Sequence, residues 1–199
     1  GATLHFVPGR LDRARRMSEL AVELEEKGDK TFEIPLGAST PLGAAGLALG
    51  FLELVDQGHR PDVLVHASSS GGTQGGLLAG VTLAALDVRV IGVSADEPQA
   101  ALAATVEVLE RGVLDLAGAD VRPRAAEVWD RFVGEGYGIP TEASKDAQLL
   151  LARSEALIVD HTYTAKALAG LIALVREESL PADSSILFWH TGGQVGVFA

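Results

Sequence analysis

Apolar residues recur along this chain with two different spacings, which alternate from one segment to the next. Short apolar runs, typical of buried strands, are separated by longer segments whose apolar positions repeat every three or four residues. The predicted strands are Leu4 to Val7, Phe32 to Pro35, Asp62 to His66, Val88 to Val93 and Ser185 to Trp189. The predicted helices are Leu11 to Lys27, Leu42 to Val55, a segment reaching Ala84, Pro98 to Val113, Ala125 to Val133, Thr141 to Ser154 and Thr164 to Glu177. This alternation predicts an α/β fold, a three-layer parallel sheet with helices on both faces.

Three of the predicted strands run into loops of small and hydroxyl-bearing residues. These loops are Gly37 to Thr40, Ser68 to Thr73 and Thr191 to Gly193. In parallel α/β sheets, ligands bind beyond the carboxyl ends of the strands. The three loops therefore predict one binding site at that edge of the sheet.

The segment from Ser68 to Gly76 carries the strongest chemical signal, because it joins an apolar strand to an apolar helix and is rich in glycine, serine and threonine. Converging backbone N–H groups, hydroxyl donors and the positive end of the helix suit a phosphate group. The segment is neither a P-loop nor a dinucleotide fingerprint, since it lacks both glycine patterns. A tight turn, or an unrelated phosphosugar or nucleotide binder, is the alternative interpretation.

The composition argues against several classes of binding partner but does not identify one. A formal net charge of -11 argues against nucleic acid and anionic membrane surfaces. The most apolar stretch, Pro41 to Val55, contains Glu53 and does not predict a membrane span. The chain has no cysteine, so a disulfide framework and a thiolate metal site are excluded, and the five histidines show no metal-ligand spacing. We expect no metal and a reducing, cytoplasmic location.

Four ordered motifs resemble one enzyme family. They are the run from Ser68 to Leu77, Gly136-Tyr137-Gly138-Ile139-Pro140, the segment from Asp160 to Ala167, and Phe188-Trp189-His190-Thr191-Gly192-Gly193. Together they resemble the D-cysteine desulfhydrase and aminocyclopropane-carboxylate deaminase group of fold-type-II, tryptophan synthase β-like pyridoxal-phosphate enzymes. The resemblance implies pyridoxal 5'-phosphate as the cofactor, a small amino-acid substrate and a homodimer. It also implies that residues 1–36 are a remnant of the family's small domain and 37–199 its large, cofactor-binding domain.

Carried over position by position, the resemblance gives roles to individual residues. The cofactor phosphate would bind Ser69, Ser70, Gly71, Gly72 and Thr73, and Thr191 would face the pyridine nitrogen. Tyr137 and Tyr163 would flank the substrate, where a phenol can donate a hydrogen bond or transfer a proton.

Two positions divide the family by substrate. This sequence has Tyr163-Thr164 and His190-Thr191, which are similar to the desulfhydrase members of the family. Deaminase-like members have Tyr-Glu and His-Leu at the same positions. The resemblance thus implies a carbon–sulfur lyase that converts D-cysteine or L-cysteate to pyruvate and ammonia. Aminocyclopropane-carboxylate deaminase and a non-catalytic phosphate-binding chain are the alternatives.

The lysine that such an enzyme needs for a Schiff base with its cofactor has no match among Lys27, Lys30, Lys145 and Lys166. Lys166 falls in a family motif but on the following helix, away from the family's Schiff-base position. The chain begins with Gly1 and its one methionine, Met17, lies within a predicted helix. We therefore expect a fragment or a partly described protein, with the lysine upstream, and a chain that is inactive as given.

Overall fold

The computed structural model describes residues 1–9, 11–177 and 180–198. It contains two compact units, Gly1–Ala38 and Ser39–Ala199, called here the N-terminal and the C-terminal unit. The N-terminal unit holds the helix α1 (Asp12–Glu25) and the short 3-10 helix η1 (Leu36–Ala38). No helix in the described ranges has the length and apolarity required to cross a bilayer.

Two predicted strands of the N-terminal unit are wrong. Within the described residues, 4–7 and 32–35 form no strand, and their apolar side chains are open to solvent, as in Phe6 (93% exposed) and Phe32 (82% exposed). A strand is completed by hydrogen bonds to a neighbouring strand. Because neither segment has such a neighbour in the described part of the chain, the two apolar runs form no strand. The prediction that the loop from Gly37 to Thr40 follows a strand is therefore wrong.

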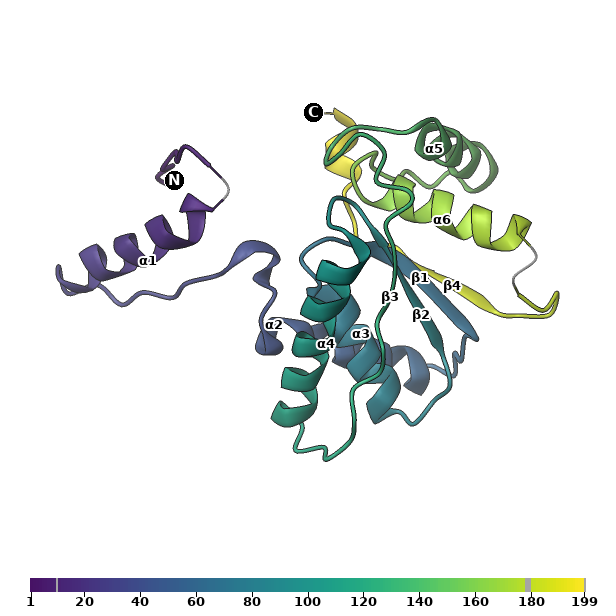
Figure 1. Cartoon of the computed structure of the whole chain (residues 1–199), viewed down its shortest axis with the longest axis horizontal. Coiled ribbons are helices and arrows are strands. Elements are labelled where there is room, and N and C mark those ends of the chain that lie inside the picture. Colours follow the sequence, from purple (N-terminus) through teal and green to yellow (C-terminus); the bar gives the residue numbers. More distant parts are fainter. Residues whose placement is uncertain (10, 178–179, 199) are drawn as a thin grey trace. The chain divides into compact units, whose positions relative to one another are not determined.

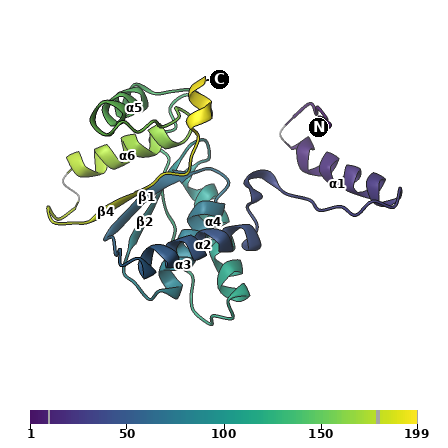
Figure 2. The same ribbon diagram turned by 180° about the vertical axis from the view of Figure 1, so that it is seen from behind.

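The C-terminal unit is built on four parallel strands (Figures 1 and 2). They are β1 (Val63–Ser68), β2 (Arg89–Ser94), β3 (Glu127–Trp129) and β4 (Ile186–Trp189), in the order β3-β2-β1-β4. The helices are α2 (Pro41–Asp56), α3 (Gly72–Leu83), α4 (Gln99–Leu116), α5 (Glu142–Glu155) and α6 (Thr164–Arg176), followed by η2 (Gln194–Phe198). The predicted parallel α/β fold is confirmed.

The helices divide between the two faces of the sheet (Figure 1). The helices α2, α3 and α4 cover one face, where Leu64 and Val90 pack against Leu77 and Val106. The helix α6 covers the other face and carries α5 on its outer side. After β3 the chain crosses from the first face of the sheet to the second. It then returns to place β4 beside β1, on the side opposite β2.

Glycines allow the three helices on one face of the sheet, α2, α3 and α4, to pack unusually close together. A Cβ on Gly76 would lie 2.1 Å from the backbone oxygen of Ala44 in α2, and one on Gly75 would lie 2.8 Å from Cβ of Leu109 in α4. Both distances are too short for a side chain. The helix α3 is therefore held between α2 and α4, which fixes where its N-terminus points.

The predicted helix from Ala125 to Val133 is wrong, because β3 occupies its first half. Ile91 pairs with Glu127 and Val93 with Trp129, and Arg89 forms an ion pair with Glu127 across the two strands. A three-residue strand is too short to show a period of two. Pairing with β2 thus decides a conformation that the local pattern leaves open.

Candidate active site

The order of the strands places one crevice at the carboxyl edge of the sheet. The chain moves from β1 to β2 to β3 and then returns to place β4 on the other side of β1, with His66 in register with Trp189. Such a reversal is a topological switch point, outside which parallel sheets bind ligands. The segment Ser69–Thr73 follows β1 and Thr191 follows β4. The two groups of predicted cofactor contacts therefore leave adjacent strands at this point.

The first of these groups forms a cup at the start of α3. Strand β1 continues through Ser68, two residues further than predicted, and Gly71 then turns the chain with φ +83° before α3 begins at Gly72. A left-handed conformation favours glycine. Among the C-terminal unit's helices, as far as the structure describes them, α3 alone has no side-chain hydrogen bond to its first turn. The backbone N–H groups of its first turn can therefore bind an anion.

The hydroxyl groups of the cup are held by two neighbours: Ser39, from the loop Gly37 to Thr40 that we predicted to share this edge, and Asp96, which was not predicted as a site residue. Ser69 donates a hydrogen bond to Oδ1 of Asp96 (2.8 Å), and Ser39 donates to Oγ of Ser70 (2.8 Å). A Cβ on Gly72 would lie 2.6 Å from Oγ of Ser39, so a side chain at this position would displace that hydroxyl. No local sequence signal reveals the pairing of Ser39 with Ser70 or of Asp96 with Ser69.

A buried hydroxyl group is a second observation that indicates that the cup suits a phosphate group. The Oγ of Ser68, at the end of β1, is buried and has no hydrogen-bond partner among the described residues. A buried hydroxyl without a partner costs free energy. Together with the uncapped helix and the hydroxyls of Ser70 and Thr73, it leaves donors available for phosphate oxygens, whereas the single hydroxyl proton of Ser69 is donated to Asp96. The residues present therefore suit the phosphate of pyridoxal 5'-phosphate.

The loop after β4 presents Thr191 to solvent on a fixed support. His190 accepts a hydrogen bond at Nδ1 from the N–H of Gly192 (3.0 Å) and donates from Nε2 to the backbone oxygen of Ile158 (3.2 Å). These partners assign its tautomer. Gly193 has φ +93°, and a Cβ there would lie 2.4 Å from Oδ1 of Asp160. The loop thus rests against the residues that precede α6.

The two predicted tyrosines meet at the same edge. The phenol oxygens of Tyr137 and Tyr163 share a short hydrogen bond, and their rings lie edge to face with centroids 5.6 Å apart. Burial, and next the hydrogen bond to Tyr137, raise the pKa of Tyr163 well above its usual range, with a further contribution from Asp96. Because Asp96 also binds Ser69 of the cup, the tyrosine pair and the cup are neighbours.

A buried carboxylate, not predicted as a site residue, supports the tyrosine pair. Asp160 is 3% exposed and accepts hydrogen bonds from the N–H groups of Thr162, Tyr163 and Thr164 and from the hydroxyl of Thr164. Burial raises the pKa of Asp160, but these hydrogen bonds outweigh it, so that the pKa lies below its usual value. An aspartate followed by threonine just before an apolar helix is a recognisable capping signal.

Two polar side chains of β1 and α3 lie beneath the cup. His66 is fully buried, its Nδ1 bonds to the backbone oxygen of Ala67 (2.8 Å), and its Nε2 has no partner in the described structure. Burial lowers the pKa of His66 to about 4, so the ring is neutral near pH 7. Gln74 fills the space above Gly92, where a Cβ would lie 2.0 Å from its Oε1. His66 is therefore a buried, neutral ring near pH 7.

Comparison with known proteins identifies the family. A family model described as pyridoxal-phosphate dependent enzyme matches residues 1–192. The chain belongs to this family. It is 35% identical over 193 residues to the D-cysteine desulfhydrase of Salmonella typhi, which covers 94% of this chain and 58% of that protein. The chain spans about three-fifths of the curated relatives it matches.

Solved structures agree with this membership in the pyridoxal-phosphate dependent enzyme family. A crystal structure of an ACC deaminase homologue superposes with a TM-score of 0.89 and 29% identity, covering 97% of this chain and 58% of that one. The processed form of threonine deaminase isoform 2 from Solanum lycopersicum, at a TM-score of 0.53 and 17% identity, shares the fold. The family predicted from the four motifs, its fold and its cofactor are confirmed.

In a pyridoxal-phosphate dependent enzyme the position of each lysine matters. Lys27 and Lys30 are exposed in the N-terminal unit, and Lys145 is exposed on α5, where it pairs with Glu142 (2.7 Å). Lys166 is fully buried, and its amine is bound to backbone oxygens of Ala95, Val133 and Gly136. Within the described C-terminal unit, neither Lys145 nor Lys166 presents a free amine at the cup.

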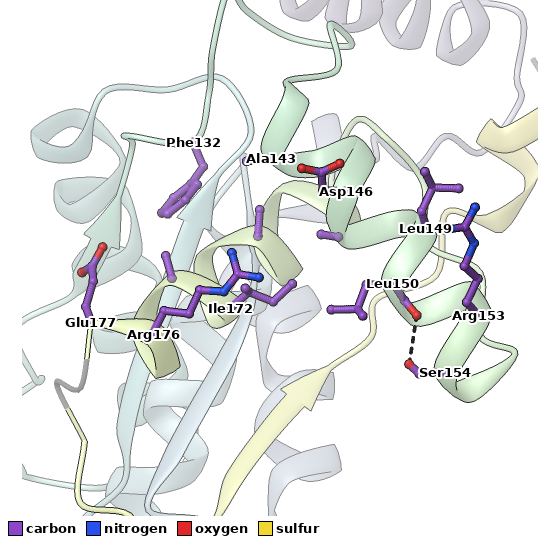
Figure 3. Close-up of a pocket in the computed structure, with 13 residues that line it drawn as sticks. Phe132, Ala143, Asp146, Leu149, Leu150, Arg153, Ser154, Ile172, Arg176 and Glu177 are labelled. Carbon is purple, nitrogen blue, oxygen red and sulfur yellow. Dashed lines mark hydrogen bonds between the residues drawn. The ribbon is translucent and has the colours of Figure 1, made fainter.

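A separate groove of about 870 Å³ lies between α5 and α6 (Figure 3). Leu149, Leu150 and Ile172 form part of its apolar lining, while Asp146 and Arg153 are among its charged residues. None of the residues predicted to contact cofactor or substrate lines it. The groove is therefore distinct from the candidate active site.

Proposed function

We propose that this chain provides the cofactor-binding part of a carbon–sulfur lyase, which removes a β-substituent from a small amino acid such as D-cysteine or L-cysteate. Pyruvate and ammonia are the products. The observation that carries this proposal is the conjunction of an uncapped helix α3, with its serine-rich cup, and the tyrosine pair at one switch point. The 35% identity to D-cysteine desulfhydrase supports the choice of substrate class.

The cup and the loop after β4 would bind and orient the cofactor. The N-terminus of α3 and the hydroxyls of Ser69, Ser70 and Thr73 would hold the phosphate, with Gly71 and Gly72 allowing close approach. Thr191 would offer a neutral hydroxyl to the pyridine nitrogen. When bound, the cofactor supplies the electron withdrawal that acidifies the substrate Cα.

The tyrosine pair would handle protons on the substrate side. Because the pKa of Tyr163 is raised, this phenol keeps its proton at neutral pH and would serve as a donor. Tyr137, 56% exposed, would close the outer side of the same pocket. A protonated phenol near the departing sulfur group stabilises the leaving thiolate or sulfite.

The proposal also requires an amine to bond with the cofactor aldehyde, and Lys166 does not provide it, since its N–H groups are already used by carbonyl oxygens. We propose that this amine comes from a segment outside the 199 residues. Intact-mass analysis of the protein from its natural source tests this point. An active enzyme consisting of these 199 residues alone would contradict it.

The substrate is tested by incubating the purified protein, loaded with pyridoxal 5'-phosphate, with three compounds in parallel. We expect sulfide and pyruvate from D-cysteine, or sulfite and pyruvate from L-cysteate, and little ammonia from aminocyclopropane-carboxylate. Ammonia from the cyclic substrate without sulfide from D-cysteine would move the protein to the deaminases. Tight cofactor binding with no turnover of any of the three would support the non-catalytic alternative.

A further inference from the structure

Lys166 forms a buried cross-link between three parts of the C-terminal unit. It lies on the first turn of α6, and its side chain has 0% exposure. Its Nζ donates hydrogen bonds to the backbone oxygens of Val133 (2.7 Å), Gly136 (2.9 Å) and, more weakly, Ala95 (3.4 Å). An ammonium group has three N–H donors. The three carbonyl groups, which come from the loops after β2 and β3, therefore match its capacity.

The segment after β3 depends on such external support. Gly134, Gly136 and Gly138 all have positive φ, so this segment has no regular repeat of its own. Its internal backbone hydrogen bonds are long, 3.2 Å from the N–H of Val133 and 3.3 Å from that of Ile139. The bonds from Lys166 to residues 133 and 136 are shorter than both.

The same segment carries Tyr137, whose side chain is more than half exposed and thus weakly fixed by packing. Its neighbour Gly136 is bound by Lys166, and Tyr163 precedes Lys166 by three residues on the same helix start. One ammonium group thus connects the segment that carries Tyr137 to the helix start that carries Tyr163.

We propose that Lys166 is a positioning residue, whose ammonium holds residues 133–136 against α6 so that the phenol of Tyr137 meets that of Tyr163. Its importance for turnover rests on the function proposed above. The geometry of the phenol pair does not, and it can be measured without substrate.

Ionisation of the phenols distinguishes positioning from a simple charge effect. The charged or titratable groups that act on Tyr163 are Tyr137, Asp96 and Asp160, with the Lys166 ammonium on the same helix. Removal of a nearby positive charge by itself raises the pKa of a phenol. Release of Tyr137 removes burial and a hydrogen bond, and so lowers the pKa of Tyr163. The two explanations therefore predict shifts of opposite sign.

The test is a spectrophotometric titration of phenolate absorbance in the cofactor-loaded protein. The chain contains two tyrosines, and a Tyr137→Phe variant, in which Tyr163 is the single phenol, assigns the titration step that belongs to Tyr163. In Lys166→Met we expect the pKa of Tyr163 to fall by about one pH unit or more, toward its ordinary value near 10. In that background, adding Tyr137→Phe should change the pKa no further. Lys166→Arg, which keeps the cation, should restore part of the shift.

Lys145→Met is the matched control, because it removes an exposed lysine on α5 and should leave the phenol titration unchanged. A folded Lys166→Met protein with an unchanged or raised pKa of Tyr163 would overturn the proposal. If Lys166→Met does not fold, nuclear magnetic resonance of the unaltered protein decides. The ammonium protons of Lys166 should then exchange slowly with water, and those of Lys145 rapidly; rapid exchange at Lys166 would overturn the proposal. These outcomes are independent of which substrate the protein turns over.

Discussion

The helices α3 and α6 both begin at the edge where the parallel strands end, yet their first turns are completed in opposite ways. The first turn of α3 receives no side-chain hydrogen bond in the described structure, and Gly71 precedes it. The first turn of α6 is closed by Asp160, whose carboxylate accepts three backbone N–H groups and a hydroxyl. The start of α6 is thus bound by a carboxylate of the same chain, whereas the start of α3 can bind an anion that is not part of the chain.

This difference explains why only one of two similar helix ends suits a phosphate. Both present positive dipole ends toward the same crevice. At α6 the N–H groups of Thr164 and Ala165 are already bound by Asp160, so that end supports Tyr163. At α3 they are available, and the hydroxyls of Ser69 and Ser70 lie beside them. The contrast favours the start of α3, rather than that of α6, as the anion-binding end.

The largest expected effect follows from giving α3 an anion of its own. In Ser70→Asp a carboxylate would lie at the cup, and like charges about 4 Å apart repel by about 4 kcal/mol near a protein surface. We expect cofactor affinity to fall about a thousandfold, measured by fluorescence titration with pyridoxal 5'-phosphate. Ser70→Ala, which removes only a hydroxyl, should lose about tenfold or less. Equal affinities for these two variants would contradict the assignment of the cup.

Acid should weaken the α3 side of the sheet before it weakens the α6 side. The pKa of His66 is about 4 in the folded protein, against an ordinary value of 6.5, because burial opposes its charge. The unfolded chain therefore binds more protons between these values, and stability falls as pH decreases from about 6.5 to 4, by about 3 kcal/mol. Urea unfolding at a series of pH values measures this loss.

The substitution His66→Gln should flatten the dependence of stability on pH in that range. Asp160 acts in a lower window, because its pKa lies below the usual value and its contribution is lost only as pH falls through that depressed pKa. Asp160→Asn should leave the upper window unchanged. A pH profile of His66→Gln that is identical to that of the unaltered protein would show that His66 is not buried as a neutral ring.

Removal of the anion from α6 should be somewhat less costly, and it should act on stability. Asp160→Ala leaves three N–H groups of a buried helix start without their acceptor, and we expect a loss of about 2 to 3 kcal/mol in the free energy of unfolding. Asp146→Ala, an exposed change on α5, should alter it by less than about 0.5 kcal/mol. If the two variants unfold alike, Asp160 does not support α6.

The sequence made the fold and the cup predictable because both depend on local patterns. The alternation of apolar runs and helical spacings predicted β1, β2, β4 and the five helices of the C-terminal unit. Ser69 to Thr73 stood out because a glycine-rich turn between a strand and a helix has few other uses. The strand β3 was missed because three residues show no period, and 4–7 and 32–35 were misjudged because strands require partners.

The supporting residues could not be predicted, because their partners are remote in sequence. The carbonyl acceptors of Lys166 are 30, 33 and 71 residues away, and Ser39 is 31 residues from Ser70. Such contacts exist only after the sheet has brought its strand ends together. Asp160 is different, since its acceptor role is local and its capping pattern was visible. The predicted roles of Ser69 to Thr73, Thr191 and the two tyrosines toward cofactor and substrate remain predictions.

The smallest expected effect concerns α5, whose start is capped by a neutral hydroxyl. Thr141 accepts from the N–H of Ser144 (3.1 Å), while Oγ of Ser144 accepts from the N–H of Thr141 (2.9 Å). Thr141→Ala should lower the free energy of unfolding by about 1 kcal/mol, and Thr141→Ser by little, since it keeps the acceptor. Cofactor affinity should be unchanged in both, because α5 lies on the outer side of α6 (Figure 1). A loss for Thr141→Ala as large as that for Asp160→Ala would mean that charge adds nothing to the cap of α6, and that α3 and α6 differ only in geometry.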